Sequence, residues 1–155
     1  QLIARNKGLT ESSTPSGIAL ATLAFLRGGL LLGDEKRYAI GERALQSAHQ
    51  TLSKLPMAAP SMLLAAAFWL GDPREIVISG SAQAPATKAL LAAAHRQYPP
   101  TRVIVRVDDG TRAHLGELTP IVAGKTEVGG RPAAYVCRRG ACDAPVVDPA
   151  MLSKR

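Results

Sequence analysis

The amino-acid sequence predicts an α+β fold in which a helical part is followed by a small α/β part. Two observations carry this prediction. Residues 14–71 hold three apolar segments of helical length, separated by glycine and proline. After them, two short runs rich in β-branched residues, 75–79 and 102–107, flank one further helical segment. We therefore divide the chain into a helical domain, 1–72, and a small α/β domain, 73–155.

The first helix is predicted to begin at Thr14-Pro15 and to end before Gly33. Thr14 or Ser13 suits the N-cap, and Pro15 suits the first helical position, where no backbone N–H is needed. The segment is apolar on nearly every face, and such a helix must be buried on all sides. The rest of this chain offers few elements to cover it.

The next two helices are predicted at residues 35–54 and 61–70. The first of them carries one apolar stripe, so it is expected to lie on the outside with one face buried. Pro56 ends it and Pro60 opens the other, which is again apolar nearly all round. An inner, an outer and an inner helix in this order indicate part of an array of helical hairpins.

The second domain is predicted to begin with a strand–helix–strand unit. The strands 75–79 and 102–107 enclose a helix at 85–97, which suits a crossover between parallel strands. Asp109-Gly110 is expected to turn the chain, and residues 112–131 to be irregular or partly helical. A third strand is expected at 133–137, and a terminal helical turn at 149–154.

Composition and charge exclude several classes of function. The net charge is +7, but the basic residues are scattered as singles and pairs without aromatic interleaving, so we predict no nucleic-acid binding. No apolar run reaches the roughly 20 residues that span a bilayer, and no signal-peptide pattern is present. We therefore expect a soluble, cytoplasmic protein that does not bind membranes.

No metal or cofactor is predicted. Two cysteines are too few for a zinc site of four thiolates, and His49, His95 and His114 lie far apart in sequence. Ser79-Gly80-Ser81 follows a predicted strand, where backbone N–H groups hold phosphates in some proteins. No accompanying glycine-rich or Gly-Lys-Ser/Thr pattern is present, so a plain connecting loop is the better interpretation.

Cys137 and Cys142 are the candidates for thiol chemistry. The positive charges of Arg138 and Arg139 favour a thiolate at the neighbouring cysteine, which makes a redox role conceivable. The alternative is a structural loop, either with two reduced thiols or with a local disulfide. The structural alternative is the better supported of the two, because four residues, not two, separate the cysteines.

Four segments of the chain, in this order, resemble one known family. They are Thr14-Pro15-Ser16-Gly17; Leu32-Gly33-Asp34 with Tyr38; Pro73-Arg74-Glu75-Ile76-Val77-Ile78; and Ala134-Tyr135-Val136-Cys137 with Cys142, Ala144-Pro145 and Asp148-Pro149. They are similar to segments near the C-terminus of the YyaL-type, spermatogenesis-associated thioredoxin-domain-containing proteins. Ile18 departs from the family pattern, which has Asn there.

The resemblance implies a fold for the whole protein. Members join a thioredoxin-like domain to an (α/α)6 barrel of the six-hairpin glycosidase kind, similar to the barrels of N-acylglucosamine 2-epimerases. This chain would then supply the terminal helices of the barrel, followed by the small βαβ-containing subdomain. The upstream barrel and the thioredoxin-like domain are the expected partners. Because the first methionine is Met57, we also expect the chain to be part of a longer protein.

The resemblance also implies a site. Barrels of this kind build sugar pockets at the ends of their inner helices, which makes Glu11, Ser16 and Trp69 candidates for a ligand pocket. Helix capping is the alternative for Glu11 and Ser16, and burial in the core is the alternative for Trp69. No catalytic residue is assigned.

The function predicted from sequence is that of a C-terminal segment of a six-hairpin, thioredoxin-domain-containing protein that binds or processes carbohydrate. In this interpretation the segment is structural and is not an enzyme by itself. The alternative is a non-catalytic module that docks a thioredoxin domain or another protein. Thiol redox chemistry at Cys137 and Cys142 is a third hypothesis.

Overall fold

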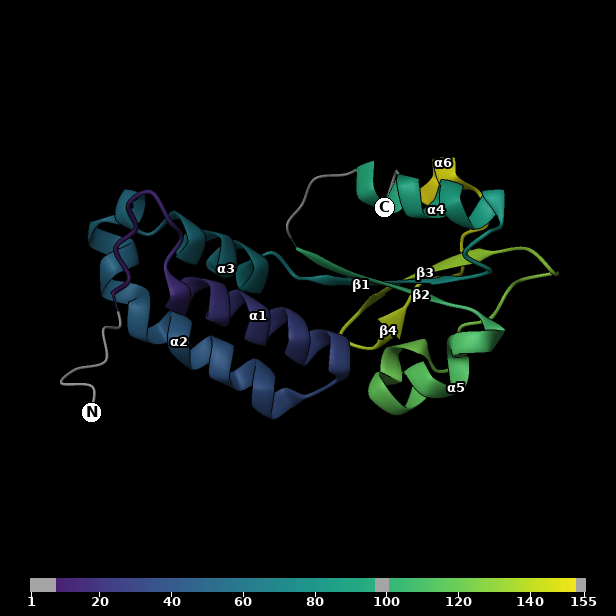
Figure 1. Cartoon of the computed structure of the whole chain (residues 1–155), viewed down its shortest axis with the longest axis horizontal. Coiled ribbons are helices and arrows are strands. Elements are labelled where there is room, and N and C mark those ends of the chain that lie inside the picture. The colour runs from purple at the N-terminus through teal and green to yellow at the C-terminus, as the bar shows by residue number, and fades with distance from the viewer. Residues whose placement is uncertain (1–7, 97–100, 153–155) are drawn as a thin grey trace. The chain divides into compact units, whose positions relative to one another are not determined.

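The computed structural model describes residues 8–96 and 101–152, and these fall into two compact units (Figure 1). The helical unit comprises Gln1–Leu30 and Asp34–Gly71, and the sheet unit comprises Leu31–Gly33 and Asp72–Arg155. The fold is α+β, with α-helices in both units and a mixed sheet in the second. The predicted helix end at 97 and the last residues of the predicted terminal turn lie outside the described residues.

The helical unit is built from α1 (Gly17–Leu32), α2 (Glu35–Lys54) and α3 (Pro60–Leu70), with the short 3-10 helix η1 (Pro56–Ala58) before α3. The predicted start of the first helix was wrong by two to three residues. Ser16, not Thr14 or Ser13, is the N-cap, because its carbonyl accepts the first helical bond from the Leu20 N–H at 3.0 Å. The bounds of α2 were predicted correctly, and α3 begins one residue earlier than expected.

Two glycines let α1 and α2 approach closely. A Cβ added at Gly41 would lie 2.7 Å from Leu26 Cγ, and one added at Gly29 would lie 2.6 Å from the backbone nitrogen of Tyr38. Around this contact, α2 buries Gly41 and Leu45 along the predicted single stripe. The small residues thus set the distance between the two helices.

The expectation that the first and third helices are buried on all sides is not met in the described residues. On α1, Leu20 is 51% exposed, and on α3, Leu64 and Leu70 are 46% and 73% exposed. Opposite faces of the same helices are buried, through Leu26 on α1 and Phe68 on α3. Three helices cannot enclose one another on every side, so apolar faces stay in contact with solvent.

The sheet unit contains β1 (Arg74–Ser79), β2 (Arg102–Val107), β3 (Ala133–Arg138) and β4 (Ala141–Cys142), in the spatial order β2-β1-β3-β4. β1 and β2 are parallel over their whole length, and α4 (Pro85–Arg96) connects them. β3 runs antiparallel to β1, and β4 runs antiparallel to β3. The short β4 was not predicted.

Helices cover both faces of this sheet. α4 and the terminal turn α6 (Pro149–Leu152) pack on one face, where Ile76 and Ile78 of β1 meet Leu90 and Leu152. The other face carries α5 (Asp109–Leu118) and the 3-10 helix η2 (Pro120–Val122), which cover Val77 (Figure 1). β1 is therefore buried on both sides, as its unbroken apolar run requires.

The expected turn at Asp109-Gly110 was wrong, because these two residues begin α5. Asp108 is the N-cap and forms a capping box with Thr111: Asp108 Oδ1 accepts the Thr111 N–H at 2.9 Å, and Thr111 Oγ1 accepts the Asp108 N–H at 3.1 Å. The Asp-Gly pair, which often marks a turn, here forms the first two residues of a helix.

Within residues 8–96 and 101–152, none of the helices combines the length and the apolar character that crossing a membrane demands.

Candidate functional sites

Glu11, a candidate for the ligand pocket, caps the start of α3. Its two carboxylate oxygens accept the Ser61 backbone N–H at 3.2 Å, and Oε2 also accepts the Ser61 hydroxyl at 3.0 Å. The Glu11 N–H donates to the Ala58 carbonyl at 2.8 Å, which fixes the segment against η1. A negative charge at the N-terminus of a helix is favourable, because unpaired N–H groups point at it.

Ser16 performs the same task for α1. Its side chain is 7% exposed, its Oγ donates to the Gly8 carbonyl at 2.9 Å, and it lies 3.5 Å from the Ala19 nitrogen. Both hydroxyl and carboxylate candidates are therefore used by the chain itself, in agreement with the capping alternative.

Trp69 lies near the C-terminal end of α3, and its indole N–H donates to Glu42 Oε1 of α2 at 2.8 Å. Trp69 lies eight positions after Ser61, where Glu11 binds, which corresponds to about 12 Å along a helix axis. The structure thus places Glu11 and Trp69 at opposite ends of α3. A shared ligand pocket at these residues stays a prediction.

Cys137 and Cys142 are joined by a disulfide that closes the hairpin between β3 and β4. Cys137 is buried, at 2% exposure, whereas Cys142 is exposed. Arg139 and Gly140 make the tight turn with positive φ angles of 49° and 81°. This is the local-disulfide form of the structural alternative; redox cycling of the pair stays a prediction.

Glu75 is a buried carboxyl beside this hairpin. It lies on β1 directly across from Cys137 and is 4% exposed. Burial raises the pKa of Glu75 above its ordinary value, and the Gly140 amide and the positive charge of Lys125 offset part of this rise. Glu75 belongs to the segment that resembles the spermatogenesis-associated family.

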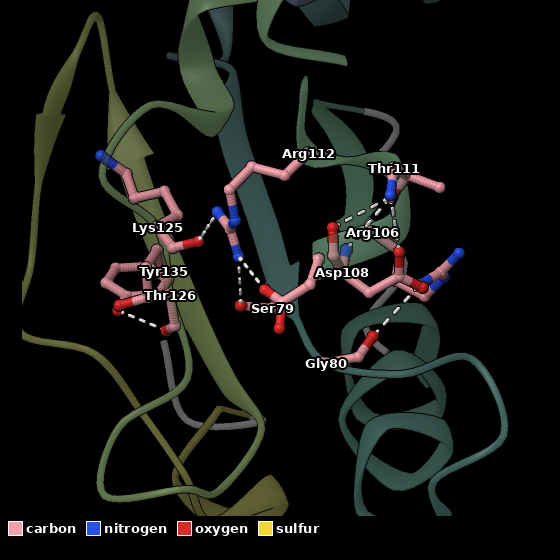
Figure 2. Close-up of polar contacts among 10 residues, drawn as sticks. Ser79, Gly80, Arg106, Asp108, Thr111, Arg112, Lys125, Thr126 and Tyr135 are labelled. Carbon is pink, nitrogen blue, oxygen red and sulfur yellow. Dashed lines mark hydrogen bonds and ion pairs between the residues drawn. The ribbon is translucent and has the colours of Figure 1, made fainter. Parts of the chain in front are cut away.

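A polar cluster not predicted from the sequence lies where β1 and β2 end (Figure 2). Arg106 Nη1 donates to the Gly80 carbonyl at 3.1 Å and forms an ion pair with Asp108. The hydrogen bonds from Arg106 and then Thr111 lower the pKa of Asp108 below its ordinary value. The arginine thereby joins the loop after β1 to the N-cap of α5.

Arg112 of α5 makes a second connection on the other side of β1. Its Nη1 donates to the Lys125 carbonyl at 2.7 Å, and its Nη2 lies 3.5 Å from the hydroxyl of Ser79, which is 1% exposed (Figure 2). The sequence did contain one signal for this cluster: an Asp directly after a β-run suits the N-cap of a helix.

The three histidines are exposed side chains on separate helices: His49 on α2, His95 on α4 and His114 on α5. In the part of the chain that the structure describes, no three His, Cys, Asp or Glu residues gather in a way that could hold a metal ion.

Fold and sites together define an α+β protein in which a three-helix unit is joined to a helix-covered, four-stranded mixed sheet with a disulfide-closed hairpin. Over 105 residues, 68% of this chain, its sequence is 31% identical to spermatogenesis-associated protein 20 of Homo sapiens and of Rattus norvegicus. The corresponding protein of Mus musculus is 30% identical over the same length. The chain is thus homologous to a segment of spermatogenesis-associated protein 20.

This homology supports membership of the spermatogenesis-associated protein 20 family, in agreement with the resemblance drawn from the four segments. The matched region covers 13% of the length of each of these relatives. The chain matches no protein-family model, and no solved structure matches it.

Proposed function

We propose that this chain is a non-catalytic structural module of a longer protein similar to spermatogenesis-associated protein 20. In that protein its helical unit supplies wall helices of an (α/α)6 barrel, next to a thioredoxin-like domain. The sheet unit then serves as a C-terminal subdomain, and the catalytic groups of the whole protein come from elsewhere in its sequence.

The observation that carries this proposal is the exposure of apolar side chains on α1 and α3. Leu20 and Phe25 of α1 are 51% and 36% exposed, and Leu63, Leu64 and Leu70 of α3 are 36%, 46% and 73% exposed. Soluble proteins keep large apolar surfaces for contact with other protein surfaces. The matched relatives are far longer than the chain, and their remaining sequence is the occupant that we assign to these faces.

The test compares one substitution in two contexts, the 155-residue chain and the full-length protein. Leu20→Gln is expected to change the free energy of unfolding of the chain by less than about 0.5 kcal/mol, since the side chain is half exposed. In the longer protein we expect a loss of about 2 kcal/mol or more, because a polar group would then be buried at the contact.

Leu118→Gln is the matched control, because Leu118 of α5 is also 51% exposed and lies in the sheet unit. It is expected to have a small effect in both contexts. Equal, small effects of Leu20→Gln in the chain and in the longer protein would overturn the proposal.

Carbohydrate binding by the whole protein is part of the same proposal, with Glu11, Ser16 and Trp69 as its candidate residues in this chain. Saccharides are expected to raise the melting temperature of the full-length protein. If Glu11→Ala, Ser16→Ala and Trp69→Phe all leave that shift intact, the pocket does not include these residues. A shift that each of the three reduces would place the ligand here, in spite of their bonds within the chain.

The alternative proposal is a module that docks the thioredoxin-like domain through the disulfide-closed hairpin. The third hypothesis, thiol redox chemistry, is separate from docking: it predicts that a thiolate of that domain attacks the Cys137–Cys142 disulfide in a thiol–disulfide exchange and that the pair cycles near the cellular redox potential. The proposed cytoplasmic location favours cycling over a permanent bond, because persistent disulfides are uncommon in reducing compartments. A Cys137–Cys142 bond that glutathione never reduces would exclude cycling.

A further inference from the structure

We propose that the sheet unit is itself a thioredoxin-like domain whose dithiol position holds alanine and threonine, so that it has lost disulfide chemistry. This inference is separate from the barrel proposal. It rests on the topology of the sheet, on the residues that begin α4, and on one buried hydroxyl.

The topology is the first argument. The chain order is β1-α4-β2-α5-β3-β4-α6, and the sheet order is β2-β1-β3-β4. β1 and β2 are parallel, whereas β3 and β4 alternate in direction. α4 and α6 share one face of the sheet and α5 covers the other (Figure 1). Thioredoxin-like folds combine the same strand order, strand directions and distribution of helices.

The second argument concerns the start of α4. In thioredoxin-like enzymes, the two cysteines of a Cys-x-x-Cys sequence lie at the N-terminus of the helix that follows the first strand of the sheet. Here α4 occupies that place, and Ala84 is its N-cap, because its carbonyl accepts the Lys88 N–H at 3.1 Å. The four residues Ala84-Pro85-Ala86-Thr87 therefore stand where the dithiol sequence would stand.

Thr87 provides the third argument. Its side chain is fully buried, and its Oγ1 is a buried polar side-chain atom without a hydrogen-bond partner in the described residues. A buried hydroxyl without a partner costs free energy, whereas a thiol at the same place behaves as a small apolar group. Thr87 corresponds to the second, buried cysteine of the dithiol, so the environment suits the sulfur better than the oxygen.

Gly80 and Pro132 lie next to Thr87. Thr87 Oγ1 lies 2.5 Å from where a Cβ of Gly80 would be, and Pro132 Cβ lies 2.8 Å from the same point. Gly80 follows β1, and Pro132 directly precedes β3. In thioredoxin-like folds a proline at the start of the third strand of this sheet faces the dithiol; Pro132 occupies this place with a trans peptide bond.

The natural disulfide does not replace this site. Cys137 is paired with Glu75 at the amino end of β1, whereas α4 begins after Ser79 at the carboxyl end. Four residues of strand correspond to about 13 Å. Cys137 and Cys142 are therefore at the opposite end of the strand from Ala84 and Thr87.

The test installs the missing thiols with the double substitution Ala84→Cys and Thr87→Cys in the 155-residue chain. The control is Ala86→Cys with Ala89→Cys, which has the same spacing on the same helix, at two exposed positions. Each protein is equilibrated in glutathione buffers, and its disulfides are identified by peptide mass mapping.

We expect positions 84 and 87 to form a disulfide that reduces reversibly, and to do so at least tenfold more readily than positions 86 and 89. A folded double variant whose new thiols pair no more readily than the control would overturn the inference. Should the double variant fail to fold, the thiol pKa values of the single variants Ala84→Cys and Ala89→Cys are compared instead. The helix N-terminus is expected to lower the thiol pKa at position 84, measured from the pH dependence of alkylation; equal values at both positions would refute the inference.

Discussion

The close contact between α1 and α2 predicts opposite effects for two neighbouring substitutions. Gly28→Ala places a Cβ 3.7 Å from Arg37 Cδ, an ordinary contact, and should stabilise the helical unit by about 0.5–1 kcal/mol because alanine is the better helix former. Gly29→Ala places a Cβ 2.6 Å from the Tyr38 nitrogen and 2.7 Å from its Cα. Since backbone cannot yield as a side-chain tip can, α1 and α2 must separate.

The magnitude follows from these distances. Forcing an extra methyl group into a packed contact costs about 1–3 kcal/mol, and the helix preference of alanine returns less than 1 kcal/mol of it. Because both variants gain the helix preference of alanine, Gly29→Ala should be less stable than Gly28→Ala by the packing cost alone, roughly 1–3 kcal/mol.

Urea unfolding of the 155-residue chain measures this difference. Trp69 is the single tryptophan and lies in the helical unit, so its fluorescence reports the unfolding of that unit. The two variants are expected to share a slope m and to differ in midpoint. A midpoint of Gly29→Ala equal to or above that of Gly28→Ala would refute the packing argument.

Three further predictions concern single side chains. Glu11→Ala should lower the free energy of unfolding by about 0.3–1 kcal/mol, because the N-terminus of α3 loses its carboxylate; urea midpoints check this, and an unchanged midpoint would contradict the capping role. Thr87→Val should leave the free energy of unfolding unchanged or raise it by about 1 kcal/mol, since a hydroxyl without a partner is removed. The control Thr22→Val removes a hydroxyl that donates to the Ile18 carbonyl at 2.7 Å and should lower the free energy of unfolding. If Thr87→Val proved the more destabilising of the two, Thr87 Oγ1 would have a partner. Because the folded state raises the pKa of Glu75 above its ordinary 4.5, the folded state binds the proton more tightly, so the contribution of Glu75 to stability falls as pH rises from about 4.5 through the folded pKa. Glu75→Gln should remove this decline, so the change in unfolding free energy on going from about pH 4 to pH 7 should be more positive in the variant than in the parent; an unchanged pH dependence would refute the assignment.

Much of the local structure could be predicted from the sequence, because short-range patterns determine it. The unbroken β-branched runs defined β1 and β2, and the glycine and proline breaks defined α2. α5 was missed because an Asp-Gly pair serves both as a turn and as the first two residues of a capped helix. The two-residue strand β4 is too short to carry any alternation of side chains.

The candidate sites were less predictable, because they depend on contacts distant in sequence. Glu11 caps a helix that begins 49 residues later, at Pro60, and no local pattern links the two. The exposure of Leu20 and Leu70 likewise depends on which elements are available to cover them, and not on the helices themselves. The sequence could identify residues with functional side chains, but it could not predict which other residues they contact.

The order of strands also bears on how the protein avoids aggregation. β2 lies at an edge of the sheet, so one row of its backbone hydrogen-bonding groups faces away from β1 and can accept a strand from another molecule. Arg102 and Arg106 stand at the first and the fifth of its six positions, on either side of the apolar core of the strand. Two such strands placed side by side would bring these like charges together. Because Arg106 also pairs with Asp108 and donates to the Gly80 carbonyl, neutralising Arg102 alone should make this edge more prone to join sheets of different molecules.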